Sequence, residues 1–154
     1  ILLGSDQGRK VYSKKLFSLV ERYSLTKKVK FFSHCKEMPL AYSIADVVVS
    51  ASIEPEAFGR VAVESQSMGK PIVASNIGGS KETILNKKSG FLYKHDDPRE
   101  LAKSLNTVIQ LSQEELKLMG NEGRKNISKK FDVEVMCDSN LREYRKLLKI
   151  NARN

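Results

Sequence analysis

Residues 51–82 read ASIEPEAFGRVAVESQSMGKPIVASNIGGSKE, and they place a loop, a helix start, a strand and a glycine-rich turn in close succession. Glu56 and Glu64 stand eight residues apart across the predicted loop-to-helix junction, and Glu82 follows a pair of glycines. Open parallel α/β sheets usually bind ligands at the carboxyl ends of their strands, beside helix amino termini. The stretch therefore predicts such a sheet with a ligand site at this edge.

Strands and helices alternate on both sides of this stretch. Short apolar runs predict buried strands at residues 1–4, 47–50 and 72–75, and further strands at residues 29–33 and 91–93. Apolar residues at helical spacing predict helices at residues 9–22, 36–44, 59–68 and 80–85, the last capped by Ser80. The alternation indicates a parallel sheet with right-handed crossovers. The predicted fold class is therefore α/β, a Rossmann-like parallel sheet flanked by helices.

The chain after Pro98 is predicted to be helical only. One helix is expected at residues 98–111, and Ser112 with Glu115 forms a capping-box pattern for a second helix to about residue 129. Asp132 is the predicted cap of a final helix. The apolar positions of that helix form one stripe, consisting of Val135, Met136, Leu141, Tyr144, Leu147 and Leu148.

Length and composition indicate one domain with a real core, because 40% of the 154 residues are hydrophobic. No apolar run approaches the roughly 18–20 residues that span a bilayer. The net charge of +9 is spread along the chain, which favours a solvated Lys-rich surface, with peripheral contact with an anionic membrane as the next interpretation. Nucleic acid is not expected as a partner, since Trp is absent and aromatic residues are few.

Cys35 and Cys137 are far apart and lack metal-ligand spacing, which predicts two free thiols in a reducing cytoplasm. No metal site is expected, because the chain has two His in all and no D-x-D element. The sequence begins with ILLGSD, without an initiator Met or a signal-peptide pattern. These features predict an internal part of a longer cytoplasmic protein.

The predicted loop-to-helix junction offers two kinds of binding group. Backbone N–H groups near Gly59 and the helix dipole favour a diphosphate, and glycine lets a ligand approach the backbone closely. The carboxylates of Glu56 and Glu64 suit sugar hydroxyls instead. A plainer alternative is that Glu64 pairs with Arg60 at i,i+4 spacing while Glu54 and Glu56 only solvate the loop.

Three motifs in this region occur in order: E-A-F-G-R-V-A-V-E, S-M-G-K-P-I-V-A-S and G-G-S-K-E. Together they closely resemble the carboxyl-terminal domain of family 4 glycosyltransferases (glycosyltransferase group 1), which are retaining enzymes of the two-domain GT-B fold. Glu56 and Glu64 match that family's E-x7-E signature. Similarity extends outward through VKFFS, SIADVVVSAS and SGFLY to the last helix, so it covers nearly the whole chain.

The resemblance implies a role for each matching residue toward a nucleoside diphosphate sugar. Glu56 would be the catalytic-site carboxylate near the transferred sugar, and Glu64 would bind the ribose hydroxyls. Phe58, Gly59 and Arg60 would contact the sugar and the diphosphate, mainly through their backbone N–H groups. Phe32 and Ser33 would border the base, while Gly78, Gly79 and Glu82 would shape the pocket.

The resemblance also implies what is missing. The chain would form a single donor-binding domain over residues 1–154, lacking the family's first strand-helix unit, with its basic clamp, and the amino-terminal acceptor domain. The expected activity of the whole protein is hexose transfer, with retention and without a metal or other cofactor, to a glycan or lipid-linked acceptor. The alternatives are a GT-B nucleotide-sugar epimerase and a basic, non-catalytic binding domain.

Overall fold

The computed structural model describes residues 1–151, and its contacts separate the chain into two compact units, Ile1–Ala41 and Tyr42–Asn154. Both contain parallel strands and helices, so the predicted α/β class is confirmed. No helix among the described residues combines the length and the apolar character that crossing a membrane requires.

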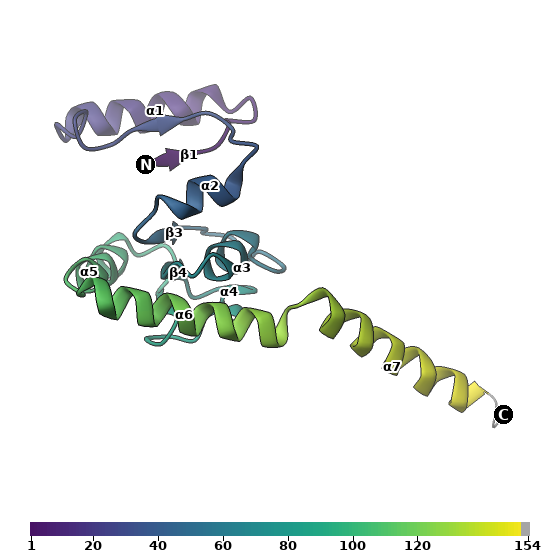
Figure 1. The fold of residues 1–154 in the computed structure, drawn as a ribbon. Coiled ribbons are helices and arrows are strands. Elements are labelled where there is room, and N and C mark those ends of the chain that lie inside the picture. Colours follow the sequence, from purple (N-terminus) through teal and green to yellow (C-terminus); the bar gives the residue numbers. More distant parts are fainter. Residues whose placement is uncertain (152–154) are drawn as a thin grey trace. The chain divides into compact units, whose positions relative to one another are not determined.

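The first unit contains β1 (Leu2–Leu3), α1 (Lys10–Arg22) and β2 (Phe31–Phe32). The two strands are parallel, with Leu2 opposite Phe31, and α1 runs alongside them (Figure 1). The Phe17 and Phe31 ring centroids lie 4.5 Å apart, which fixes α1 against β2. The prediction of a buried strand at residues 1–4 is wrong: Leu2 and Leu3 are 46% and 37% exposed, because so short a strand pair encloses little surface.

The chain continues from one unit to the next through α2 (Met38–Ser43). The strands of the second unit are β3 (Val48–Ser50), β4 (Ile72–Ser75) and β5 (Gly90–Tyr93), which form a parallel sheet in the order β3-β4-β5. Its helices are α3 (Arg60–Ser67), α4 (Ser80–Thr83), α5 (Pro98–Ile109), α6 (Gln113–Lys130) and α7 (Val133–Asn151). The predicted helical carboxyl-terminal segment is thus confirmed.

The central strand β4 is completely buried and divides the core of the second unit into two layers. Ile72 and Ala74 pack with residues of α3 and with Ile84 on one face. Val73 packs with Tyr93 and with residues of α5 and α6 on the other face. This alternation follows from the two-residue period of a strand, and it explains why the whole run from residue 72 to 75 is apolar or small.

Two expectations about burial and capping are corrected by the structure. Val49 of β3 is exposed, whereas the sequence predicts a strand covered on both faces, because β3 is an edge strand and the enclosed position belongs to β4. Ser80 does not cap α4: it is the first residue of the helix, and Gly79 occupies the cap position without a side-chain hydrogen bond.

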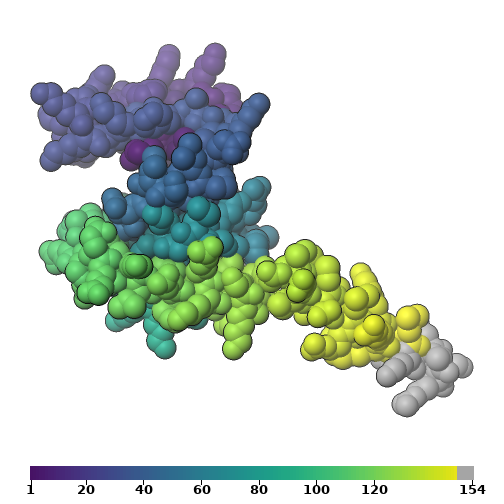
Figure 2. All heavy atoms as spheres, viewed as in Figure 1, coloured from purple at the N-terminus to yellow at the C-terminus, as the bar shows by residue number. Residues whose placement is uncertain are grey.

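Side-chain caps begin the three long helices, and those predicted for α6 and α7 are confirmed. Asp97 accepts hydrogen bonds from the N–H groups of the first turn of α5. Ser112 and Glu115 form a reciprocal capping box at the start of α6. The Asp132 carboxylate accepts a hydrogen bond from the N–H of Glu134 at the start of α7. The apolar residues that were predicted to form one stripe on α7 are all exposed to solvent. Figure 2 shows the atoms of this helix in yellow-green to yellow.

Candidate functional site

The amino end of α3 follows the loop that leaves the carboxyl end of β3. Gly59 occupies the cap position with φ 76° and ψ 62°, a left-handed conformation that favours glycine. Gly59 is buried and provides no side-chain acceptor, so no side chain caps the helix. Uncapped N–H groups at a helix amino end, together with the helix dipole, are suited to binding an anion.

The glycine-rich turn after β4 lies directly on the backbone of that loop. The N–H of Gly79 donates a 2.9 Å hydrogen bond to the carbonyl oxygen of Glu56. A Cβ atom at Gly78 would lie 2.4 Å from the carbonyl oxygen of Glu56, and one at Gly79 would lie 2.4 Å from that of Phe58. The closeness of the two backbones therefore requires glycine at both positions.

A buried polar network supports the turn that contains Gly78 and Gly79. The Thr83 hydroxyl donates to the carbonyl oxygen of Gly79 at 2.9 Å. The Thr83 carbonyl oxygen accepts from the side-chain amides of Gln66 on α3, at 3.1 Å, and Asn126 on α6, at 3.0 Å. The network thus joins three helices to the turn that supports the loop before α3.

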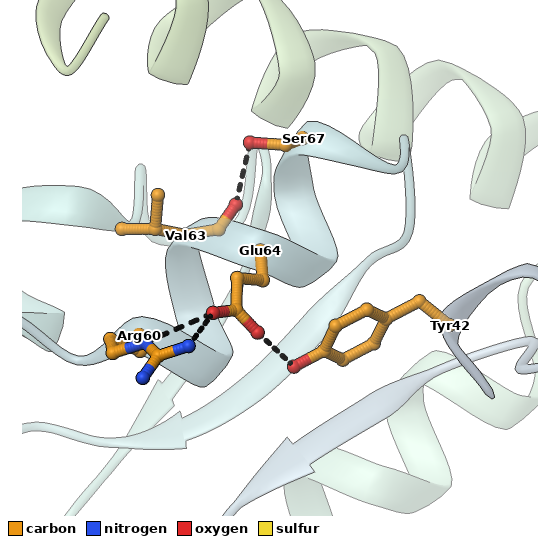
Figure 3. A network of polar contacts seen from close by, with 5 residues as sticks. All are labelled: Tyr42, Arg60, Val63, Glu64 and Ser67. Atoms are coloured by element: carbon orange, nitrogen blue, oxygen red, sulfur yellow. Dashed lines mark hydrogen bonds and ion pairs between the residues drawn. The ribbon is translucent and has the colours of Figure 1, made fainter. Parts of the chain in front are cut away.

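Glu64 accepts hydrogen bonds on both oxygens of its carboxylate (Figure 3). Oε1 accepts from Nε of Arg60 at 3.1 Å and from Nη2 at 2.8 Å. Oε2 accepts from the hydroxyl of Tyr42 at 3.0 Å. The i,i+4 pairing with Arg60 that the plainer alternative predicted is therefore present, but it is one of two attachments. Burial, and then the hydrogen bond to Glu64, raise the pKa of the Tyr42 hydroxyl, which stays protonated.

Glu56 lies on the exposed loop, eight residues before Glu64. Its Oε1 accepts a hydrogen bond from the hydroxyl of Ser52 in the same loop. The Ser52 bond holds the side chain, while the bond from Gly79 holds the backbone of the same residue. Glu56 is thus an oriented carboxylate with an accessible face.

The other predicted site residues with side chains are exposed. Phe58 is exposed on one side, and its ring meets that of Phe131 edge to face, with centroids 5.9 Å apart. Glu82 is exposed in the short helix α4. Phe32 and Ser33 are exposed at the end of β2 in the first unit. The second unit by itself brings together Glu56, Phe58, Gly59, Arg60, Glu64, Gly78 and Gly79 around the start of α3.

Tyr42 and Ser52 hold the two carboxylates, and neither residue was predicted from the sequence. Tyr42 is 22 residues from Glu64 in sequence, and no local pattern predicts that contact. Ser52 is four residues before Glu56 in a loop, where spacing carries no fixed direction. Among residues 1–151 there is no group of three or more His, Cys, Asp or Glu side chains that could hold a metal ion.

Comparison with known proteins gives a family match over most of the chain. The family model described as "Glycosyl transferases group 1" matches residues 3–126. The spore coat protein SA of Bacillus subtilis is 30% identical over 112 residues, which is 72% of this chain and 29% of that protein. A D-inositol 3-phosphate glycosyltransferase of Corynebacterium urealyticum is 36% identical over 98 residues, or 62% of this chain and 23% of that protein.

Solved structures give a similar match. A glycosyltransferase from Rickettsia africae superposes with a TM-score of 0.88 at 31% identity, covering 96% of this chain and 39% of that one. Anabaena Alr3699/HepE, in complex with UDP and glucose, superposes with a TM-score of 0.84 at 32% identity, covering 94% and 39%. This chain therefore spans less than a third of these two curated relatives and about two fifths of these two structures.

Proposed function

The chain belongs to the group 1 glycosyl transferases, and we propose that it is the donor-binding part of a retaining enzyme that moves a hexose from a nucleoside diphosphate sugar to a glycan or lipid-linked acceptor. The proposal covers the whole protein's activity, of which this chain is one part. It places the chain in the carboxyl-terminal half of a GT-B enzyme, as a single donor-binding domain whose catalytic cleft needs an acceptor domain.

The arrangement around the start of α3 carries this proposal. Glu56 and Glu64 flank an uncapped helix amino end, and the Gly78-Gly79 turn fixes the loop between them. Anion-binding donors thus lie beside two carboxylates, which is the combination that a sugar joined to a diphosphate requires. HepE, whose relevant part has the same fold at 32% identity, was solved with UDP-glucose, which supports this donor class.

The proposed roles follow the chemistry of each group. Glu64 accepts from the ribose hydroxyls, and Glu56 accepts from hydroxyls of the transferred sugar. The N–H groups of Gly59 and Arg60, with the helix dipole, stabilise the charge that develops on the leaving diphosphate. No metal or other cofactor is proposed. Phe58 contacts the sugar, while the assignment of Phe32 and Ser33 to the base stays a prediction from the resemblance.

The supporting groups have a structural part in this proposal. Gly78 and Gly79 hold the loop in place, and Glu82 shapes the rim of the site from α4. The acceptor is proposed to lie at the cytoplasmic face of an anionic membrane, for which the net charge of +9 is the supporting feature.

Calorimetry and product analysis with the intact gene product test the proposal. Saturable binding of UDP or GDP is expected, and Glu56→Gln should abolish sugar transfer while leaving nucleotide affinity within about threefold, since a threefold change is small beside a lost hydrogen bond to a charged group. Glu54→Gln, an exposed neighbour in the same loop, is the control and should retain transfer. Absence of nucleotide binding would contradict the proposal, and release of an epimerised sugar in place of a transfer product would support the epimerase instead.

A further inference from the structure

Glu64 has two partners that differ sharply in exposure. Tyr42 is 5% exposed, whereas the side chain of Arg60 is 84% exposed and that of Glu64 33% exposed. We propose that Tyr42 is a positioning residue that fixes the Glu64 carboxylate for the ribose hydroxyls of the donor, and that Arg60 is the partner which the ribose displaces. The inference rests on the proposed function, in which Glu64 binds ribose.

The Tyr42 attachment to Glu64 is made by a buried donor. An ionised carboxylate only accepts hydrogen bonds, so the Tyr42 hydroxyl is the donor in the 3.0 Å contact. Its burial keeps water from competing for the proton. Tyr42 belongs to the end of α2, and the Lys70 ammonium donates to the carbonyl oxygen of the next residue, Ser43, at 2.8 Å. The ring is therefore anchored beside α3.

The Arg60 attachment is replaceable. Ion pairs between exposed side chains contribute little, because water screens them and holding two flexible chains costs entropy. Arg60 nevertheless uses two N–H groups on the same oxygen, Oε1. An oxygen with two lone pairs is saturated by two such donors.

The two carboxylate oxygens of Glu64 have a limited number of acceptor sites for the ribose hydroxyls. Oε2 accepts one bond, from Tyr42, and has one lone pair open. A second ribose hydroxyl needs a site on Oε1, which Arg60 must release. Arg60 is the first residue of α3, so the released guanidinium is at the end of the helix where the diphosphate is proposed to bind. Donor binding thus exchanges one anionic partner of Arg60 for another while Tyr42 stays in place.

Nucleotides that differ only in the ribose hydroxyls test the inference. Binding of UDP and GDP to the intact gene product is compared by calorimetry with binding of the 2′,3′-dideoxy forms. The unaltered protein should prefer the ribose forms by roughly tenfold to hundredfold, as expected for hydrogen bonds to a charged group. Tyr42→Phe should reduce this preference to about threefold or less, with affinity for the dideoxy forms unchanged, because one positioned acceptor is lost.

Tyr93→Phe is the matched control. Tyr93 is also 5% exposed, and its hydroxyl accepts a hydrogen bond from Ser75, so the substitution removes a comparable buried contact in the core. It should leave the ribose preference intact. An equal loss of affinity for ribose and dideoxy forms in Tyr42→Phe would show a general structural role and overturn the inference, as would an unchanged preference.

Arg60→Gln provides a second test at an exposed position, independent of how Tyr42→Phe folds. Overall affinity should fall, because the diphosphate loses a cation, while the ribose preference is retained or increased. A lost preference in Arg60→Gln would overturn the displacement of Arg60. Failure of the unaltered protein to bind any of the nucleotides would overturn the proposed function, and the inference with it.

Discussion

The backbone N–H of Gly79 donates to the carbonyl oxygen of Glu56 at 2.9 Å, so the turn after β4 and the loop before α3 are joined at the residue proposed to contact the sugar. The backbones approach so closely that a side chain at Gly79 has no space. A substitution in the turn should therefore affect the site as well as the fold.

Gly79→Ala is expected to lower the free energy of unfolding by about 1–3 kcal/mol, the range for overpacking. The new Cβ atom would lie 2.4 Å from the carbonyl oxygen of Phe58, and backbone atoms must move to admit it. Urea denaturation of the intact gene product measures the change. A loss of nucleotide binding is also expected, because the loop at the start of α3 would shift.

Gly69→Ala is the control that separates the steric clash of Gly79→Ala from the effect of backbone strain. Gly69 has φ 68°, and a Cβ atom added there would meet no neighbouring atom within 4 Å, so its substitution introduces strain alone. We expect a cost of about 1 kcal/mol for Ala at positive φ, with nucleotide binding retained. Equal effects of the two substitutions on binding would contradict a specific role of the turn.

Asn126→Ala should destabilise the protein by about 1–3 kcal/mol, the range for removing one partner of a buried hydrogen bond. Its side-chain amide donates to the carbonyl oxygen of Thr83, which joins α6 to the support of the glycine turn. Thermal unfolding measures the effect. Asn121→Ala on an exposed face of α6 is the control, with an expected change within about 0.5 kcal/mol; a similar loss in both variants would contradict the network.

Stability should depend on pH through the capping box of α6. Hydrogen bonds from the backbone N–H and hydroxyl of Ser112 lower the pKa of Glu115. A lowered folded-state pKa means that the stabilisation is complete above the unfolded-state pKa and is lost as pH falls through the folded value. The advantage of the unaltered protein over Glu115→Gln should therefore be present at pH 7 and vanish on acidification below the usual range of a glutamate. Denaturation curves between pH 7 and pH 3 measure it, and an advantage that grew with acid would contradict the assignment.

Local chemistry predicted much of the fold. Ser112 and Asp132 specify their helix starts by side chains that bond within three residues, and the predicted strand at residues 72–75 is the buried strand β4. Exposure was predicted less well, because the burial of a short apolar run depends on what covers it. Leu2 and Val49 are apolar but exposed for that reason.

The candidate site also contains residues that the sequence predicts and residues that it does not. The two carboxylates are recognisable from spacing, because the motif itself sets them on one loop and one helix, and the glycines are recognisable as a pair that follows the next strand. Their supports are not, since Tyr42 reaches Glu64 across 22 residues and Asn126 reaches Thr83 across 43. Such contacts arise only when separate elements pack, and no periodicity encodes them.

Ser52→Ala is expected to lower the turnover of sugar transfer about threefold to tenfold in the intact gene product, the effect of losing one hydrogen bond of about 1 kcal/mol. The Ser52 hydroxyl donates to the Glu56 carboxylate and orients the group proposed to contact the transferred sugar. Affinity for UDP or GDP should change little, because the ribose and diphosphate are proposed to bind at Glu64 and the start of α3. Steady-state kinetics and calorimetry together measure the two effects.

Ser67→Ala is the appropriate comparison for this last experiment. The Ser67 hydroxyl donates only within α3, to the carbonyl oxygen of Val63 at 2.9 Å (Figure 3). Its loss should leave both turnover and affinity near their original values. If Ser52→Ala instead weakened nucleotide binding as much as turnover, Ser52 would be acting on the whole loop, and the orientation of Glu56 would need another cause. If turnover were unchanged, the hydrogen bond to Glu56 would have no part in the reaction.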